Sequence, residues 1–381
     1  MAYFDNGATT YPKPQEVYDF ADKFYREYGV NVGRGQHKQA SAAAQMIEET
    51  RNLLRDLFHC PSREVIFTPT ATEALNIVLQ GLSWKDGQTV YITTFEHNAV
   101  MRILNYLTGI YALDVRELAV DKTTLTYDLE KIEYQFQDKA PDAVVMSHAS
   151  NVCGVVAPIF EICGIAKKYN AVTVVDLAQT AGLIDIDLMK TQADYAIFAG
   201  HKTLYSPSGT AGIICDKNPN IKPLLYGGTG GDSGNDTLPK DSPARFEVGS
   251  PNCYALAGLN ASLKWIKQAG IENIYKHEMA IKNSLISTLC EHSNIKLVGY
   301  GKGEQIGVVS ATFRGYTPNN IGLILRERDI AVRTGLHCSP QAHKFLGTFP
   351  SGTVRFSVGY FNSDEDMVSL NKVLSFIETN G

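Results

Sequence analysis

The feature that most constrains the fold is the alternation of strand and helix periods along the first 215 residues. Strand candidates, most of them short apolar runs, cover residues 64–68, 89–94, 114–120, 143–147, 172–176, 195–199 and 211–215. Apolar residues at helical spacing cover residues 43–58, 72–82, 98–111, 129–136 and 160–169. This alternation predicts an α/β fold in which a mostly parallel sheet carries helices on both faces.

The second half of the chain has a different character. A glycine-rich stretch over residues 226–234 predicts a loop, and neither a Walker nor a dinucleotide-binding spacing occurs in it. Helices are expected at residues 253–268, 271–290, 319–328 and 364–377, and strands at residues 296–300, 307–313, 331–334 and 353–359. We therefore expect a large domain over residues 15–255. A smaller α+β domain would combine residues 1–14 and 256–381.

Charge and composition exclude several classes of function. The net charge is −5 and no long basic block occurs, so neither nucleic acid nor a membrane surface is expected as a partner. The N-terminus lacks the pattern of a secretory signal, and no apolar run approaches the ~20 residues of a membrane span. The seven cysteines include no Cys-x-x-Cys pair, which argues against disulfides and metal. A cytoplasmic protein without metal is expected.

Two charged residues come at the ends of expected strands. Asp176 ends the run 172–176, and Lys202 follows the run 195–199 after Gly200 and His201. In parallel sheets, ligands bind at the carboxyl ends of the strands. Pyridoxal phosphate (PLP) needs a lysine to hold it and a carboxylate to keep its pyridine nitrogen protonated. Either residue alone is usually a solvated charge or a turn former, but together they indicate a PLP site.

Further polar groups follow neighbouring strands. Residues 68–74 join a strand to a helix, where free backbone N–H groups could bind a phosphate, although a plain threonine cap explains the same pattern. His97 ends the next strand and could lie against a cofactor ring, and a structural role is the alternative. Asn151 follows the strand 143–147, where it could also form a turn.

The combined motifs resemble the PLP enzymes of the class V aminotransferase fold, and within them the cysteine desulfurase and selenocysteine lyase group. They occupy residues 5–10, 71–74, 96–97, 150–152, 176–179, 200–202 and 333–338. The resemblance runs from residue 5 to about residue 361. It implies the fold type I of PLP-dependent transferases, with a mostly parallel seven-stranded sheet in the large domain and a smaller α+β C-terminal domain.

The resemblance also implies roles for residues around the cofactor. Lys202 would hold PLP covalently and later carry a proton. Asp176 would pair with the pyridine nitrogen, Gln179 would contact the ring oxygen, and His97 would stack on the ring.

Other residues would bind the phosphate and the substrate. Ala71, Thr72 and His201 would hold the phosphate, and Ser250 of the adjacent subunit of a homodimer would complete that site. Arg355 would clamp the substrate carboxylate bidentately, and the small domain would carry it together with Cys338. Asn151 would assist at a substrate or ring oxygen, and Arg333 is expected near the substrate.

Cys338 carries the most specific expectation. It lies on what should be a short flexible loop, and His337 and Arg333 could stabilise its thiolate. In a desulfurase, this thiolate would attack the sulfur of bound L-cysteine, leaving L-alanine and a persulfide on Cys338. Without the surrounding PLP motifs, an inert loop cysteine would be the better explanation.

The resemblance leaves several alternatives open. The short segment between Cys338 and Arg355 is typical of Suf-type (group II) enzymes, which commonly pass sulfur to an acceptor protein, for example for iron–sulfur cluster assembly. Ala199 and Leu336 depart from the family pattern, since a hydroxyl and a second histidine are common there. A selenocysteine lyase, an aminotransferase or other PLP lyase that does not use Cys338, and a scaffold protein without cofactor are the competing hypotheses.

Overall fold

A computed structural model describes residues 1–32, 35–230 and 234–380. Of the glycine-rich stretch, residues 231–233 lie outside the described part. The main sheet has seven strands in the order β2-β8-β7-β6-β5-β3-β4. These are β2 (Glu64–Thr68), β3 (Thr89–Ile92), β4 (Asp114–Glu117), β5 (Ala143–Ser147), β6 (Val172–Asp176), β7 (Tyr195–Ala199) and β8 (Ala211–Cys215). Only β8 runs antiparallel to its neighbours, so the prediction of a mostly parallel seven-stranded sheet is confirmed.

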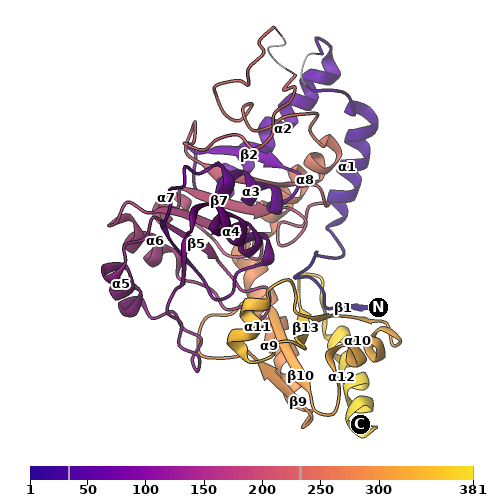
Figure 1. Cartoon of the computed structure of the whole chain (residues 1–381). Helices are drawn as coiled ribbons and strands as arrows, with labels where there is room; N and C mark the ends of the chain where they lie inside the picture. The colour runs from indigo at the N-terminus through magenta and orange to yellow at the C-terminus, as the bar shows by residue number, and fades with distance from the viewer. Residues whose placement is uncertain (33–34, 231–233, 381) are drawn as a thin grey trace.

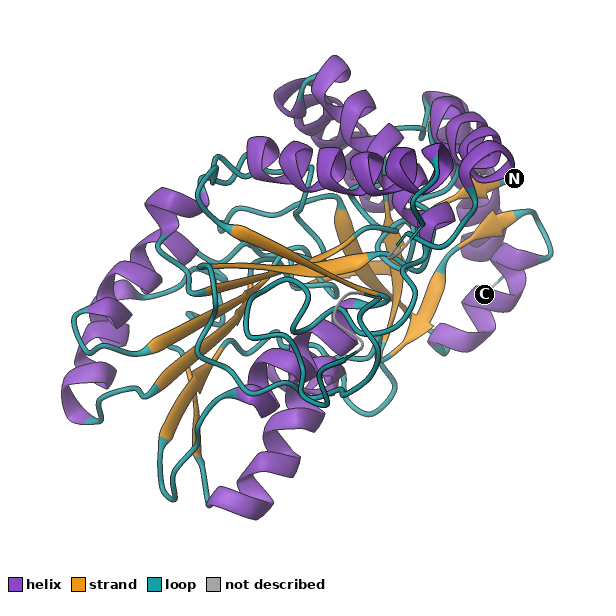
Figure 2. Cartoon of the chain, turned by 90° about the horizontal axis from the view of Figure 1, so that it is seen from above, coloured by secondary structure: helices purple, strands orange, loops and turns teal. Residues whose placement is uncertain are grey.

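Helices cover both faces of this sheet (Figure 2). They are α1 (Gln15–Tyr28), α2 (Lys38–Leu57), α3 (Ala71–Gly81), α4 (Asn98–Tyr111), α5 (Leu129–Asp138), α6 (Ile159–Lys167), α7 (Leu188–Thr191) and α8 (Cys253–Ala269). Successive side chains of a strand point to opposite faces. Val144 and Met146 of β5 therefore join the core under α2, α5, α6 and α8, whereas Ala143 and Val145 join the core under α3 and α4.

A smaller unit with its own core follows (Figure 1). Its four-stranded antiparallel sheet has the order β12-β13-β10-β9. Its elements are α9 (Ile271–Cys290), β9 (Ile295–Val298), β10 (Val308–Phe313), α10 (Pro318–Arg326), β11 (Ile330–Ala331), β12 (Arg333–Gly335), α11 (Pro340–Leu346), β13 (Thr353–Ser357) and α12 (Asp364–Thr379). The N-terminal strand β1 (Ala2–Tyr3) pairs with β11, so the start of the chain lies beside its last third.

The division into domains at residue 255 remains a proposal. Helix α8 begins at Cys253, and most members of the core that its buried residues join belong to the large sheet and its helices, although this core also includes Ile274 of α9 and Val308 of β10. We therefore propose that α8 belongs with the large sheet and that α9 opens the smaller unit. Helix α11 was not among the expected elements, because its seven residues are too short for a clear helical period.

The topology decides where polar residues meet. Because β3, β5, β6 and β7 are parallel, the residues that follow them come together at one edge of the sheet. The smaller sheet closes over the same edge, since β13 carries Arg355 and β12 leads into Cys338. In the described part of the chain, no helix combines the length and hydrophobicity needed to cross a membrane.

Candidate active site

A pocket of about 320 Å³ opens at the carboxyl edge of the large sheet. It is lined by residues of both sheets, and most of the residues singled out from the sequence face it. These are Ala71, Thr72, His97, Asn151, Asp176, Gln179, His201, Lys202, Arg333, Cys338 and Arg355. Residues almost 300 positions apart in the chain therefore share one cavity.

Ser250 is the residue from the expected set that does not line this pocket. It lies on the surface just before α8, where its hydroxyl accepts a hydrogen bond from Asn31 at 3.4 Å. Its expected role was at the phosphate site of a neighbouring subunit, and that role stays a prediction.

Lys202 and Asp176 are electrostatically coupled across the pocket. Loss of hydration lowers the pKa of Lys202 to about 8, and the Asp176 carboxylate partly offsets this shift. Burial raises the pKa of Asp176, while the Ala178 N–H, 2.8 Å from Oδ1, and the Lys202 charge oppose the rise. A cationic partner for Asp176 would therefore stabilise its ionised form.

His97 and His201, two of the three histidines that line the pocket, are neutral at physiological pH. Burial lowers the pKa of His97 to about 4, and the positive charge of Lys202 contributes to the shift. His201 has a pKa of about 4 for the same two reasons. The His97 ring also caps α4, because its Nδ1 accepts from the Ala99 N–H at 3.0 Å. A neutral ring fixed in this way can lie against a planar ligand without charge repulsion.

The start of α3 offers an anion site beside Lys202. Thr70 caps this helix through its side chain, which accepts from the Glu73 N–H at 3.1 Å. Ala71 and Thr72 follow at the pocket wall, where N–H groups of the first turn favour a phosphate. Thr203, considered as a substitute for the hydroxyl missing at Ala199, does not line this pocket, and its buried hydroxyl faces a separate small cavity.

Arg355 enters the pocket from the smaller sheet. It lies on β13 opposite Arg333 of β12, so two guanidinium groups approach the same side of the cavity. The Arg355 side chain is only 2% exposed, and its Nη1 donates to the backbone carbonyl of Asn151 at 2.9 Å. A buried guanidinium beside an open pocket is suited to bind a carboxylate.

Asn151 fastens the loop that carries Cys338. Its Nδ2 donates to the carbonyl of His337 at 2.6 Å, and its Oδ1 accepts from the Ser339 hydroxyl at 2.7 Å. The carbonyl of Cys338 itself accepts from the Asn98 N–H at 2.7 Å. Hydrogen bonds on both sides of Cys338 therefore anchor the loop backbone, while the Cys338 side chain is exposed. The expected flexibility of this loop stays a prediction.

His337 does not support Cys338 in the way its position in the sequence indicates. Its ring is buried, Nε2 is 2.9 Å from the Thr353 hydroxyl, and the ring packs near His343. Burial lowers the pKa of His337 to about 2, and Arg355 adds to the shift. A neutral imidazole cannot stabilise a thiolate by charge, so that task would fall to the cations that line the same pocket, Lys202, Arg333 and Arg355.

Gln179, which lines the pocket, and Glu96, which lies behind the pocket residues His97 and Ser147, have partners that the sequence did not reveal. Gln179 donates through Nε2 to the carbonyl of Gly7 at 3.0 Å. Glu96 is completely buried and accepts from the Ser147 N–H at 2.7 Å and from the Ser147 hydroxyl at 2.8 Å. It thereby joins the ends of β3 and β5 beneath His97. The only signal for this in the sequence is its place next to His97.

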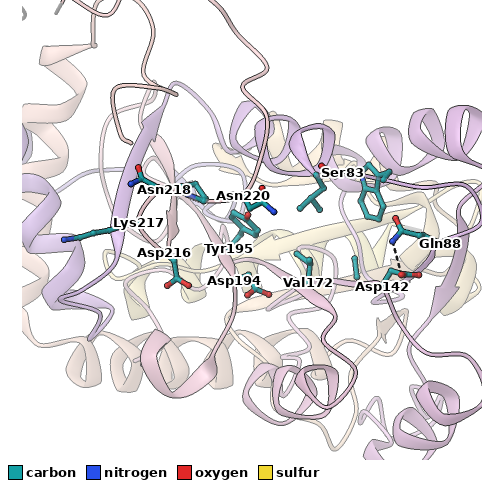
Figure 3. A pocket seen from close by; sticks show the side chains of 14 residues that line it. Ser83, Gln88, Asp142, Val172, Asp194, Tyr195, Asp216, Lys217, Asn218 and Asn220 are labelled. Atoms are coloured by element: carbon teal, nitrogen blue, oxygen red, sulfur yellow. Dashed lines mark hydrogen bonds between the residues drawn. The ribbon is translucent and has the colours of Figure 1, made fainter. Parts of the chain in front are cut away.

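A second pocket lies at the opposite edge of the large sheet (Figure 3). It has a volume of about 430 Å³ and is lined by Tyr195 and Val172, which begin β7 and β6. Its carboxylates are already engaged: Asp142 accepts from Gln88 at 2.9 Å and Asp194 pairs with Lys167 at 2.6 Å. The pocket shares none of the candidate catalytic residues, so size alone does not identify the active site.

The pocket at the carboxyl edge fits PLP. Lys202 has an amine with a lowered pKa, Asp176 has a buried carboxylate whose ionised form needs a cationic partner, and α3 offers N–H groups for a phosphate. The neutral rings of His97 and His201 complete the wall. When bound, PLP would act as an electron sink for a bond broken next to an amino group.

Comparisons with known proteins agree with this architecture. The family described as "Aminotransferase class-V" matches residues 2–370. A probable cysteine desulfurase of Methanothermobacter thermautotrophicus is 33% identical over 386 aligned residues, covering 98% of this chain and 94% of that protein. A cysteine desulfurase of Yersinia pseudotuberculosis is 31% identical, covering 99% of this chain and 93% of that protein.

A solved structure agrees as well. The apo structure of a cysteine desulfurase from Thermococcus onnurineus NA1 superposes with a TM-score of 0.92 at 30% identity, covering 100% of this chain and 95% of that one. The match extends over both sheets and the pocket between them, which confirms the fold expected from the sequence. The chain belongs to the class V aminotransferase family.

Proposed function

We propose that this chain is a PLP-dependent cysteine desulfurase that converts L-cysteine to L-alanine and retains the sulfur as a persulfide on Cys338. The observation that carries the proposal is the shared pocket of Lys202, Asp176, Arg355 and Cys338. A PLP enzyme without sulfur chemistry needs the first three groups but has no use for an exposed thiol at the pocket wall. The names of the relatives point to the same activity.

Each residue has a task that follows from its position. Arg355, with Arg333, would bind the substrate carboxylate and orient the amino acid. Lys202 would hold PLP and, as a neutral amine, move protons at the substrate. Asp176 would hold a proton at the pyridine nitrogen. The Cys338 thiolate would form a bond to the substrate sulfur as that sulfur's bond to carbon breaks.

Substrate, acceptor and subunit organisation extend this proposal. A selenocysteine lyase would use the same pocket, and incubation with L-cysteine and L-selenocysteine, measuring alanine with sulfide or selenide, separates the two. The exposed position of Cys338 suits delivery of sulfur to an acceptor protein. The exposed position of Ser250 is compatible with the expected contact to a neighbouring subunit of a homodimer.

The lowered pKa of Lys202 predicts how cofactor loading depends on pH. Only the neutral amine can attack the aldehyde of PLP, and its share rises with pH until the pKa of about 8 is passed. The rate of PLP incorporation into the apoprotein should therefore rise roughly tenfold per pH unit below that pKa and level off above it. Stopped-flow absorbance measures this rate, and a flat profile from about pH 6 to about pH 9 would contradict the assignment.

The contacts of Asn151 predict a defect in sulfur transfer. Asn151→Ala removes both side-chain hydrogen bonds that hold the Cys338 loop, so the thiol should lose its position. We expect sulfide release to slow by about 10- to 100-fold, because small misplacements of reacting groups cost that much. Cofactor absorbance should stay near that of the wild type.

Ser339→Ala is a matched control for this effect. It removes only the bond to Oδ1 and leaves the donor to the His337 carbonyl in place. It should slow sulfide release less than Asn151→Ala does. If Asn151→Ala instead impairs cofactor binding and leaves sulfur transfer unchanged, its main contact is with the ring or the substrate.

A further inference from the structure

The guanidinium of Arg355 is paired with a carboxylate from the N-terminal segment of the same chain. Asp5 Oδ1 accepts from Arg355 Nη2 at 2.7 Å, and Asp5 Oδ2 accepts from Arg333 Nε at 3.2 Å. Each oxygen of one carboxylate thus faces a different arginine. These are the two cations at the pocket side where the substrate carboxylate would bind.

The backbone holds Asp5 in this position. Residue Asp5 forms a parallel bridge with Ser357 of β13, and the Gly7 N–H donates to the Ser357 hydroxyl at 2.8 Å. A Cβ atom added to Gly7 would lie 3.3 Å from Arg355 Cζ, so the turn packs directly against the guanidinium. The fold of this segment therefore places the Asp5 backbone beside Arg355, and the Asp5 side chain completes the contact.

The guanidinium keeps an unused donor beside this contact. Nη1 donates to the Asn151 carbonyl and Nη2 to Asp5, whereas Nε is buried and has no hydrogen-bond partner among residues 1–32, 35–230 and 234–380. Burial lowers the pKa of Arg355, and Asp5 opposes that shift as its nearest anion. Arg355 is thus stabilised by Asp5, and a bidentate contact to a second carboxylate would need Nη2, which Asp5 occupies, together with Nε.

We propose that Asp5 is a placeholder for the substrate carboxylate: it engages Arg355 in the free enzyme and yields this contact, while keeping Arg333, when an α-carboxylate binds. The proposal rests on the proposed function and names a positioning residue for it. Two arginines and one aspartate leave a single positive charge, which one carboxylate neutralises. Asp5 holds the guanidinium groups of Arg333 and Arg355 in position. It also weakens binding of the substrate carboxylate, because both carboxylates compete for Nη2 of Arg355.

Asp5→Asn in the PLP-loaded enzyme separates this role from a structural one. The amide oxygen can still accept from an arginine, but the competing negative charge is lost. Propionate binding is measured by competition with L-cysteine. Propionate should bind about 5- to 30-fold more tightly to the variant than to the wild type. Cysteamine, which has an amine and a thiol but no carboxylate, should bind within about 2-fold of the wild type. Weaker or unchanged propionate binding overturns the proposal. If Asp5 only held the two arginines in place, its loss would weaken carboxylate binding or leave it unchanged.

Further measurements keep the result interpretable. Asp364→Asn removes an exposed carboxylate of the same unit and should leave propionate binding unchanged. Asp5→Glu retains the charge and should bind propionate as weakly as the wild type does.

If Asp5→Asn does not fold, a crystal structure of the wild-type enzyme with propionate tests the same proposal. Arg355 should then contact propionate and no longer contact Asp5. An intact pair of Arg355 and Asp5 overturns the proposal. Failure of the wild type to release sulfide from cysteine would instead sink the proposed function alone.

Discussion

Replacing Lys202 with alanine is expected to reduce sulfide release from L-cysteine by at least about 10³-fold. The change removes the covalent anchor of PLP and the amine that moves protons, and each such group typically contributes two to four orders of magnitude. Alanine and sulfide production measure the loss, and absorbance shows whether PLP is still held. Lys202→Arg keeps a positive charge but has no amine that can bond to PLP and move protons. It should therefore lose sulfide release to the same extent.

The fold should survive this substitution. The Lys202 carbonyl accepts from the Tyr205 N–H at 2.8 Å and from the Thr10 hydroxyl at 3.0 Å, and both are backbone contacts of Lys202 that alanine retains. Lys217→Ala is a suitable control, because Lys217 lines the pocket at the opposite edge of the sheet. If Lys202→Ala keeps near-normal activity, Lys202 is not the residue that holds the cofactor.

Replacing Cys338 with serine is expected to abolish persulfide formation and lower sulfide release by at least about 10³-fold. A hydroxyl is a far weaker nucleophile than a thiolate toward sulfur, while serine preserves the size of the side chain. PLP absorbance and its change on adding L-cysteine should persist, because Lys202, Asp176 and Arg355 are untouched. Quantified sulfide and the absorbance of the holoenzyme together check both statements.

The chain provides a matched control for this experiment. Cys290 is the other exposed cysteine of the described residues, and it lies at the end of α9 away from the pocket. Cys290→Ser should therefore behave like the wild type. If Cys338→Ser releases sulfide normally, another group accepts the sulfur. If both the wild type and Cys338→Ser show only slow transamination and no sulfide release, the result favours the aminotransferase hypothesis.

The sequence predicted the parts of the site that follow directly from strand ends. Asp176 and Lys202 come next to continuous apolar runs, and the parallel sheet brings such ends to one edge regardless of loop detail. Most strands of the large sheet were recognisable for the same reason, since buried parallel strands are apolar throughout. Strand β4 is the exception, because it lies at the end of the strand order and three of its four residues are charged. Helix α3 was recognisable from the threonines and the acidic residue at its start.

The sequence did not predict contacts that depend on distant segments packing together. The pair formed by Asp5 and Arg355 joins residues 350 positions apart, and the hydrogen bond from Asn151 to His337 spans 186 positions. The direction of the His337 ring depends on the left-handed backbone of the loop, where φ is 48°, and on the Thr353 hydroxyl from β13. No local period or motif encodes such geometry, because it arises only when the smaller sheet closes over the large one.

The most direct test of the proposed function is to map sulfur on the protein after a single turnover. The PLP-loaded enzyme is mixed with L-cysteine without reductant, and its peptides are analysed by mass spectrometry while free alanine is quantified. The proposal predicts one additional sulfur atom on the peptide that contains Cys338 and an equal amount of alanine. Alanine formed without added sulfur at Cys338, or sulfur found on another cysteine, would contradict it.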